Sequence, residues 1–140
     1  MDGTALKALR QALQTSIGTH LNAGFLKLFQ NNFTPNFDTV IGDFTEADFT
    51  GYAAIEAAGA ATVGIDPVTG DLIVVWADGT NFLNTGAVEQ TIYGWYVTNA
   101  AENASFMAGR FETTQVVHQN GDIISVGSVV ARIPPEILRN

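Results

Sequence analysis

The region from Asp66 to Ile133 is a succession of short apolar runs separated by turn signals, and this pattern limits the fold more than any other feature. The runs are rich in Val, Ile, Tyr, Trp and Phe, which favour strands. Pro134 and Pro135 end the last run, because proline cannot donate a hydrogen bond to a strand ladder. Many short strands with closely spaced turns are typical of antiparallel sandwiches. We therefore expect a mainly β protein with an antiparallel β-sandwich or jelly-roll-like domain.

Two of the turn signals also predict which strands pair. Asp78-Gly79 separates the apolar run Leu72–Ala77 from residues 80–84, so it predicts a hairpin between them. Asn120-Gly121, with strand-like segments on both sides, is the strongest short hairpin signal in the chain.

Residues 31–53, called the strap below, follow neither the strand nor the helix period and are expected to be irregular. Burying a Phe ring is worth about 1.5–3 kcal/mol, so aromatic residues do not favour an exposed loop. We expect the strap to cross the body of the domain and to be held there by its rings, which are Phe33, Phe37, Phe44, Phe49 and Tyr52. Thr45 to Asp48 further resembles one helical turn with Thr45 as its N-cap.

An amphipathic helix is expected at residues 5–21, where apolar residues recur at three- and four-residue steps. Its apolar stripe comprises Leu6, Leu9, Leu13, Ile17 and Leu21. Two interpretations stay open, a helix packed on its own domain or an arm that docks on a neighbouring subunit. In the second, removing residues 1–22 would leave the β domain folded. We expect this result, because a strand-rich chain can close its sandwich without a helix, whereas a lone amphipathic helix needs a partner surface. The chain accordingly divides into a helix or arm, residues 1–24, and a β domain, residues 25–140, which includes the strap.

Charge is scarce in this chain and unevenly distributed. Charged residues make up 14% of the sequence, against roughly 25% in ordinary domains, and the net charge is −8. Residues 28–109 hold acidic side chains and no Lys or Arg, a composition that disfavours nucleic acid and anionic membranes as partners. The low charge fraction favours a homo-oligomer that buries part of its surface.

No pattern in the sequence indicates an enzyme, a cofactor or a metal. His20 and His118 are the only imidazoles, and neither has an acid and a nucleophile nearby in sequence. The acidic residues of the strap could hold a cation but are more often loop caps and solubilising charges; they are Asp38, Asp43, Glu46 and Asp48. We therefore expect a binding or structural protein.

Residues 26–53, LKLFQNNFTPNFDTVIGDFTEADFTGYA, resemble a segment of small structural proteins of tailed bacteriophages. The resemblance implies a virion component on the capsid surface, specifically a decoration (cement) protein that stabilises the head through contacts with the major capsid protein. We expect it to act as a homotrimer. The candidate interface residues are Leu6, Leu9, Leu13, Ile17, Phe33, Phe37, Phe44, Phe49 and Tyr52.

A second hypothesis is a receptor- or glycan-binding head domain of a phage tail or fibre. It rests on the aromatic residues Trp76, Tyr93, Trp95 and Tyr96, which could stack against sugar rings.

Overall fold

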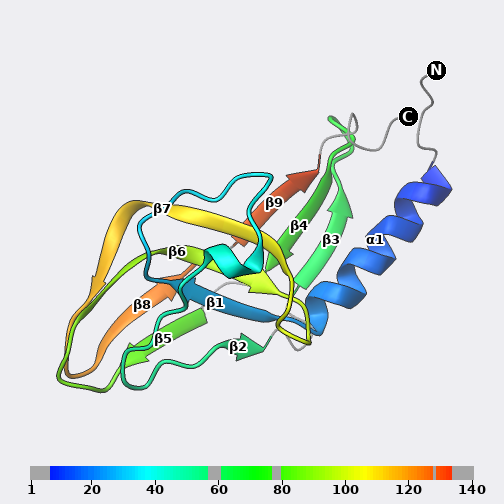
Figure 1. Cartoon of the computed structure of the whole chain (residues 1–140). Helices are drawn as coiled ribbons and strands as arrows, with labels where there is room; N and C mark the ends of the chain where they lie inside the picture. The colour runs from blue at the N-terminus through cyan, green and yellow to red at the C-terminus, as the bar shows by residue number, and fades with distance from the viewer. Residues whose placement is uncertain (1–6, 57–60, 77–79, 128, 134–140) are drawn as a thin grey trace.

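The computed structural model describes residues 7–56, 61–76, 80–127 and 129–133, and the statements below concern these residues. They form one helix, one short 3-10 turn (η1, Ile41–Asp43) and nine strands (Figure 1). In chain order the longer elements are α1 (Lys7–Asn22), β1 (Phe25–Phe29), β2 (Ile55–Glu56), β3 (Ala61–Ile65), β4 (Leu72–Trp76), β5 (Thr80–Asn84), β6 (Gln90–Thr98), β7 (Ser105–Val117), β8 (Asp122–Val126) and β9 (Val129–Ile133).

The strands form three antiparallel sheets, with the orders β2-β1-β6-β7, β3-β4-β9 and β5-β8. One face of the four-stranded sheet packs against the two smaller sheets, as in a sandwich, and the strap crosses its other face (Figure 1). The expected mainly β, antiparallel fold with one N-terminal helix is confirmed.

The predicted hairpin between residues 72–77 and 80–84 is wrong. Both edges of β4 are occupied, one by β3 and the other by β9, while β5 pairs with β8. The Asp78-Gly79 signal itself lies outside the described residues. Sheet pairing over long sequence separation has overridden the local turn preference.

The Asn120-Gly121 turn forms as its sequence indicates, but it does not close a hairpin. Both residues have positive φ, 60° and 97°. However, β7 pairs with β6 and β8 pairs with β5, so the chain changes sheets at this turn. The turn's backbone donates instead to the neighbouring β5–β6 connection, from Asn120 N to Gly86 O at 3.0 Å and from Gly121 N to Asn84 O at 2.7 Å.

The core draws side chains from all three sheets and from the helix. Its buried members are Leu21, Leu26, Leu28, Ala47, Phe49, Val74, Phe82, Ile92, Val97, Val117, Ile124 and Val126. Ala47 and Phe49 belong to the strap, so this segment contributes to the core as well as covering the sheet.

Helix α1 packs on its own domain. It runs beside β3 (Figure 1), and the Gln14 side chain donates to the Val63 carbonyl at 2.5 Å. Leu21 is 2% exposed in the core, and Ile17 packs against the core from outside, whereas Leu9 remains 54% exposed. Of the two interpretations left open above, the contacts therefore favour the packed helix for its C-terminal half.

Candidate protein-binding surface

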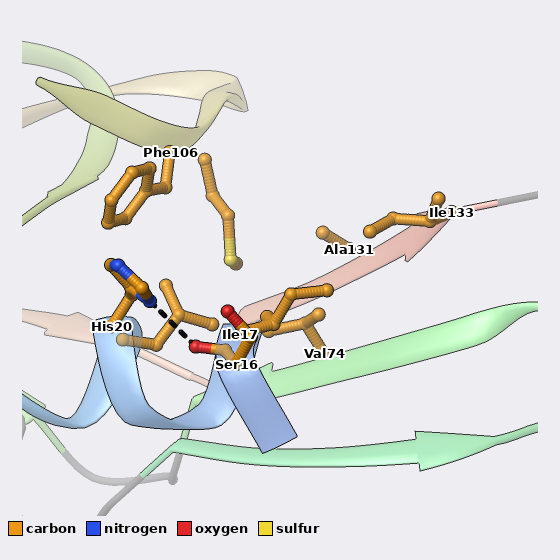
Figure 2. Close-up of a pocket in the computed structure, with 9 residues that line it drawn as sticks. Ser16, Ile17, His20, Val74, Phe106, Ala131 and Ile133 are labelled. Atoms are coloured by element: carbon orange, nitrogen blue, oxygen red, sulfur yellow. Dashed lines mark hydrogen bonds between the residues drawn. The ribbon is translucent and has the colours of Figure 1, made fainter. Parts of the chain in front are cut away.

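An apolar groove lies between helix α1 and strand β7 (Figure 2). Its volume is about 390 Å³, and Ile17, Leu21 and Val74 contribute to its walls together with Met107 of β7. Ala131 and Ile133 of β9 complete the lining, with Ser16, His20 and Phe106. The groove is thus bounded by elements far apart in the sequence and contains few polar groups.

Phe106 stands at the edge of this groove because of a β-bulge. Val97 pairs with Met107 and Thr98 pairs with Ser105, which leaves Phe106 as the extra residue on β7. Bulges of this kind redirect a side chain away from the regular pleat. The Phe106 ring is 45% exposed, and its centroid lies 6.0 Å from that of His20 in an edge-to-face arrangement.

The strap is held on the outer face of the four-stranded sheet by a cluster of four rings. Phe29 of β1, Tyr96 of β6 and the strap residues Phe33 and Phe44 form this cluster. The ring centroids of Phe29, Phe33 and Phe44 are 5.1–5.4 Å apart. Phe44 stacks on Tyr96 at 4.2 Å with the ring planes 5° apart. Such pairs add about 0.5–1.5 kcal/mol to the effect of burial.

Beyond this cluster the strap continues as an extended segment along β1. Gln30 N donates to Thr45 O at 2.8 Å, and Ala47 N donates to Leu28 O at 2.9 Å. The helical turn predicted for Thr45 to Asp48 is therefore wrong, since these backbone groups complete the edge of the sheet. A 3-10 turn occurs earlier, at Ile41–Asp43, where the Asp43 carboxylate accepts from Val40 N at 2.9 Å.

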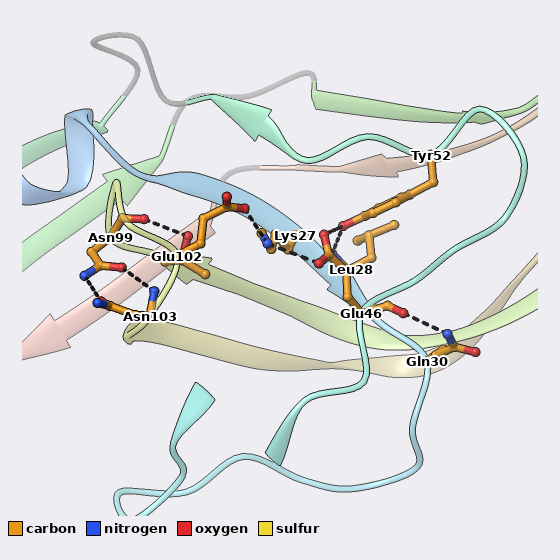
Figure 3. A network of polar contacts seen from close by, with 9 residues as sticks. Lys27, Leu28, Gln30, Glu46, Tyr52, Asn99, Glu102 and Asn103 are labelled. Atoms are coloured by element: carbon orange, nitrogen blue, oxygen red, sulfur yellow. Dashed lines mark hydrogen bonds and ion pairs between the residues drawn. The ribbon is translucent and has the colours of Figure 1, made fainter. Parts of the chain in front are cut away.

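A buried cation joins the strap to the sheet (Figure 3). Lys27 of β1 is 7% exposed, and its Nζ lies 3.1 Å from Glu46 of the strap and 2.6 Å from Glu102 of the β6–β7 turn. Burial acts to lower the pKa of this ammonium, but the hydrogen bonds and charges of Glu102 and Glu46 outweigh it, so the pKa is raised. Lys27 is therefore charged at neutral pH.

Tyr52 extends this polar network into the core. Its hydroxyl donates to Glu46 Oε1 at 3.0 Å and accepts from Leu28 N at 3.1 Å. Burial, above all, raises the pKa of this phenol. Its ring packs against Phe49 at 5.3 Å and stacks on Phe82 of β5 at 5.6 Å. Tyr52 and Phe49, which is 6% exposed, thus fix the end of the strap to the domain's own core.

The tip of the strap, residues 35–40, is the part that the domain does not cover. The expectation that Phe37 helps to hold the strap is wrong, because this residue is 97% exposed; Val40 is 60% exposed. A second groove of about 390 Å³ separates this tip from the first residues of β7, and Phe37, Phe44 and Phe106 are among its lining residues. Because Phe106 and Met107 border both grooves, the two form one continuous surface with Phe37 at its far side.

The predicted interface residues that the structure describes divide into four groups. Leu9 and Phe37 are exposed and Ile17 lines the α1–β7 groove. Phe33, Phe44 and Leu13 are half-buried, whereas Phe49 and Tyr52 belong to the core region of their own chain. Leu6 lies outside the described residues. The place of Phe106 in this surface was not predicted. Its only signal in the sequence is that it is a large apolar residue in a run that otherwise follows strand spacing.

Three acidic side chains of the strap make polar contacts with other residues of the domain. Glu46 binds Lys27 and Tyr52, Asp43 caps the 3-10 turn, and Asp48 Oδ1 accepts from Gln90 Nε2 at 2.6 Å. Among the described residues, no group of three or more His, Asp or Glu side chains is arranged to hold a metal ion. His118 pairs with Glu89 at 3.0 Å on the surface.

The described side chains of the glycan-binding hypothesis, Tyr93, Trp95 and Tyr96, do not share one surface. Tyr96 is 3% exposed beneath Phe44, whereas Trp95 packs against the core on the opposite face. Tyr93 lies under the Arg110 guanidinium, with 5.2 Å from Cζ to the ring centroid. The side chain of Trp76 is not among those described. Tyr93, Trp95 and Tyr96 therefore provide no common stacking platform.

In the part of the chain that the structure describes, none of the helices has the length and apolar character needed to span a membrane. Compared with known protein families, curated proteins and solved structures, the chain matches no family model, no curated protein and no solved structure.

Proposed function

We propose that this chain is a structural protein of a tailed-bacteriophage virion, a capsid decoration protein that binds the outer surface of the head as a homotrimer. Two arguments support the proposal. One is the resemblance of residues 26–53 to a segment of phage structural proteins. The other is that the same segment contains an exposed apolar tip, and this observation carries the proposal.

The geometry suits a protein that acts by contact. Rings, backbone hydrogen bonds and the Lys27 ion pairs fix the strap at several points, while Phe37 and Phe106 remain exposed beside two grooves. A pre-ordered surface loses less conformational entropy on binding than a loose loop would. On a capsid, burial of apolar surface across neighbouring subunits would add contact area where the shell is under internal pressure.

The proposal is tested on purified particles and heads. Mass spectrometry of virions from the source phage should detect the chain, and electron cryo-microscopy should place density of its size on the outer shell. Added to heads that lack it, the purified protein should co-sediment with them and raise the temperature at which they rupture. Absence from virions, or a failure to bind the heads, would contradict the proposal.

A further inference from the structure

The Phe37 ring is apolar and uncovered, and it is carried by an ordered turn. The turn that carries it is held by hydrogen bonds from Asp38 N to Asn36 Oδ1 at 2.9 Å and from Asn36 N to Thr39 Oγ1 at 2.8 Å. Thr39 N also donates to Asn36 O at 3.1 Å. At 97% exposure, the ring has almost no contact with its own chain. A large apolar side chain presented in this way fits an anchor that enters a pocket on a partner.

The groove between α1 and β7 has the size and lining to receive such a ring. A cavity of about 150 Å³ already accommodates benzene, and this groove measures about 390 Å³. Ile17, Val74, Met107 and Ile133 supply apolar walls, and Phe106 offers an aromatic edge at the rim. Its rim residue Ser16 is exposed, so the groove can be approached from solvent.

The strap and helix α1 have opposite charge in their sequences, while the groove itself is lined by no Lys or Arg. The strap contains Asp38, Asp43 and Asp48 as exposed carboxylates and has no Lys or Arg, and its remaining acid, Glu46, is paired with Lys27. Helix α1 has the opposite composition, with two basic residues, a histidine and no Asp or Glu in its sequence. A strap from one molecule is thus attracted to the helix of another, in a chain whose net charge of −8 otherwise opposes self-association.

We propose that the strap tip of one copy docks in the α1–β7 groove of the next copy, with the Phe37 ring between helix and strand. Successive copies joined in this way close into a ring, as the proposed trimer requires, whereas two copies that exchange straps reciprocally would form a two-fold dimer. This inference rests on the proposed self-association and specifies the contact that forms it.

Sedimentation velocity across a concentration series tests the contact. Phe37→Ser should weaken self-association at least tenfold, and Ser16→Trp, which fills the groove from its exposed rim, should do the same. Val68→Ser removes an equally accessible apolar side chain, 90% exposed at the β3–β4 turn, and should leave association unchanged. Thermal unfolding of each variant confirms that it is folded. A monomeric wild type, or variants that associate like it, would overturn the inference.

Cross-linking distinguishes head-to-tail from two-fold contact. The chain has no Cys, so Asp38→Cys and Ser16→Cys each introduce a single thiol. With a short bis-maleimide, a mixture of the two variants should give cross-linked dimers that neither variant gives alone. The double variant should form covalent rings, and the largest band counts the subunits. Dimers from Asp38→Cys alone would show that two strap tips meet instead, and a double variant whose largest product is a dimer would show a reciprocal two-fold exchange; either result would refute the proposal.

The same variants separate this inference from the proposed function. If the wild-type ring forms but does not bind heads, the virion role fails and the contact stands. If the Phe37→Ser variant still forms the oligomeric ring but no longer binds heads, the Phe37 side chain contacts the shell. The head-to-tail contact is then refuted.

Discussion

At the scale of single residues, the strap rings differ sharply in what they stabilise. Phe49 is 6% exposed in the core and Phe37 is 97% exposed at the tip. We expect Phe49→Ala to lower the free energy of unfolding by about 3–5 kcal/mol, as core aromatic truncations do. Phe37→Ala is the matched control and should change it by less than about 0.5 kcal/mol in monomeric protein. Urea denaturation of dilute samples measures both, and equal losses would contradict the assignment of the two rings.

Lys27 permits a second test at this scale, because its charge is buried while its partners are partly exposed. Removing one member of a buried pair costs about 3–5 kcal/mol, but Glu46 and Glu102 retain side-chain exposures of 37% and 45%. Lys27→Met should therefore lower the free energy of unfolding by less than this, about 1–3 kcal/mol. Glu46→Gln should lower the free energy of unfolding by less in the Lys27→Met background than in the wild type. In that background the substitution removes a carboxylate that has already lost its cation. Additive losses in this double-mutant cycle would indicate that the pair is not coupled.

At the scale of elements, local sequence signals predicted turns better than pairings. The composition of residues 66–133 was sufficient for the class of fold, and Asn120-Gly121 adopted the expected positive φ values. Which strands lie side by side depends on contacts between distant residues, so the β4–β5 hairpin could not be excluded from sequence. Thr45 failed as an N-cap because β1 offers the backbone of residues 45–47 a sheet edge to pair with.

The candidate surface was only partly predictable for the same reason. Because the strap is irregular but rich in aromatic residues, its sequence predicted that these rings would be buried against the domain. Sequence alone could not separate Phe37, which is exposed, from Phe49, which is buried, because both lie in aperiodic stretches. The α1–β7 groove depends on four elements meeting and on a bulge at Phe106, neither of which has a local signature.

Helix α1 provides an element-scale prediction. Because Leu21 lies in the core and Ile17 packs against it, deleting residues 1–22 should lower the melting temperature by about 10 °C or more. Leu21→Ala should cost about 2–5 kcal/mol, whereas Leu9→Ala, at a 54% exposed position of the same helix, should be nearly neutral. Thermal unfolding followed by circular dichroism measures all three. An unchanged melting temperature after the deletion would support the docking-arm interpretation instead.

The β3–β4 turn should make stability depend on pH in the acid range. Backbone N–H donation from Val68, the Arg132 guanidinium and Thr69 N–H together lower the pKa of Asp66 from 3.8 to about 2. A lowered pKa contributes stability that is complete above the unfolded value near 4 and is lost as pH falls toward 2. The melting-temperature difference between wild type and Asp66→Asn should thus be constant above about pH 5 and should shrink between pH 4 and 2. Asp38→Asn, at the exposed strap tip, is the control. A difference that does not change with pH would contradict this role for Asp66.

At the scale of the whole molecule, a small chain with little charge presents a fixed apolar surface to solvent. Charged residues are 14% of the sequence, and the exposed residues Phe37 and Phe106 lie over one connected region. Contiguous exposed apolar surface of this kind marks interaction sites in soluble proteins. The strap, the helix and β7 are separate elements, but all three border that region, so the fold as a whole creates it.

Self-association through this surface should make thermal stability depend on protein concentration. A partner that binds only the folded state stabilises it by mass action, so the melting temperature of an oligomer rises with concentration and that of a monomer does not. We expect light scattering at micromolar concentration to give about three times the chain mass of 14.9 kDa. The melting temperature should rise over a hundredfold concentration range, and Phe37→Ser should abolish the rise while Val68→Ser preserves it. A stable mass of 14.9 kDa with a constant melting temperature would show that the apolar surface is not used between copies.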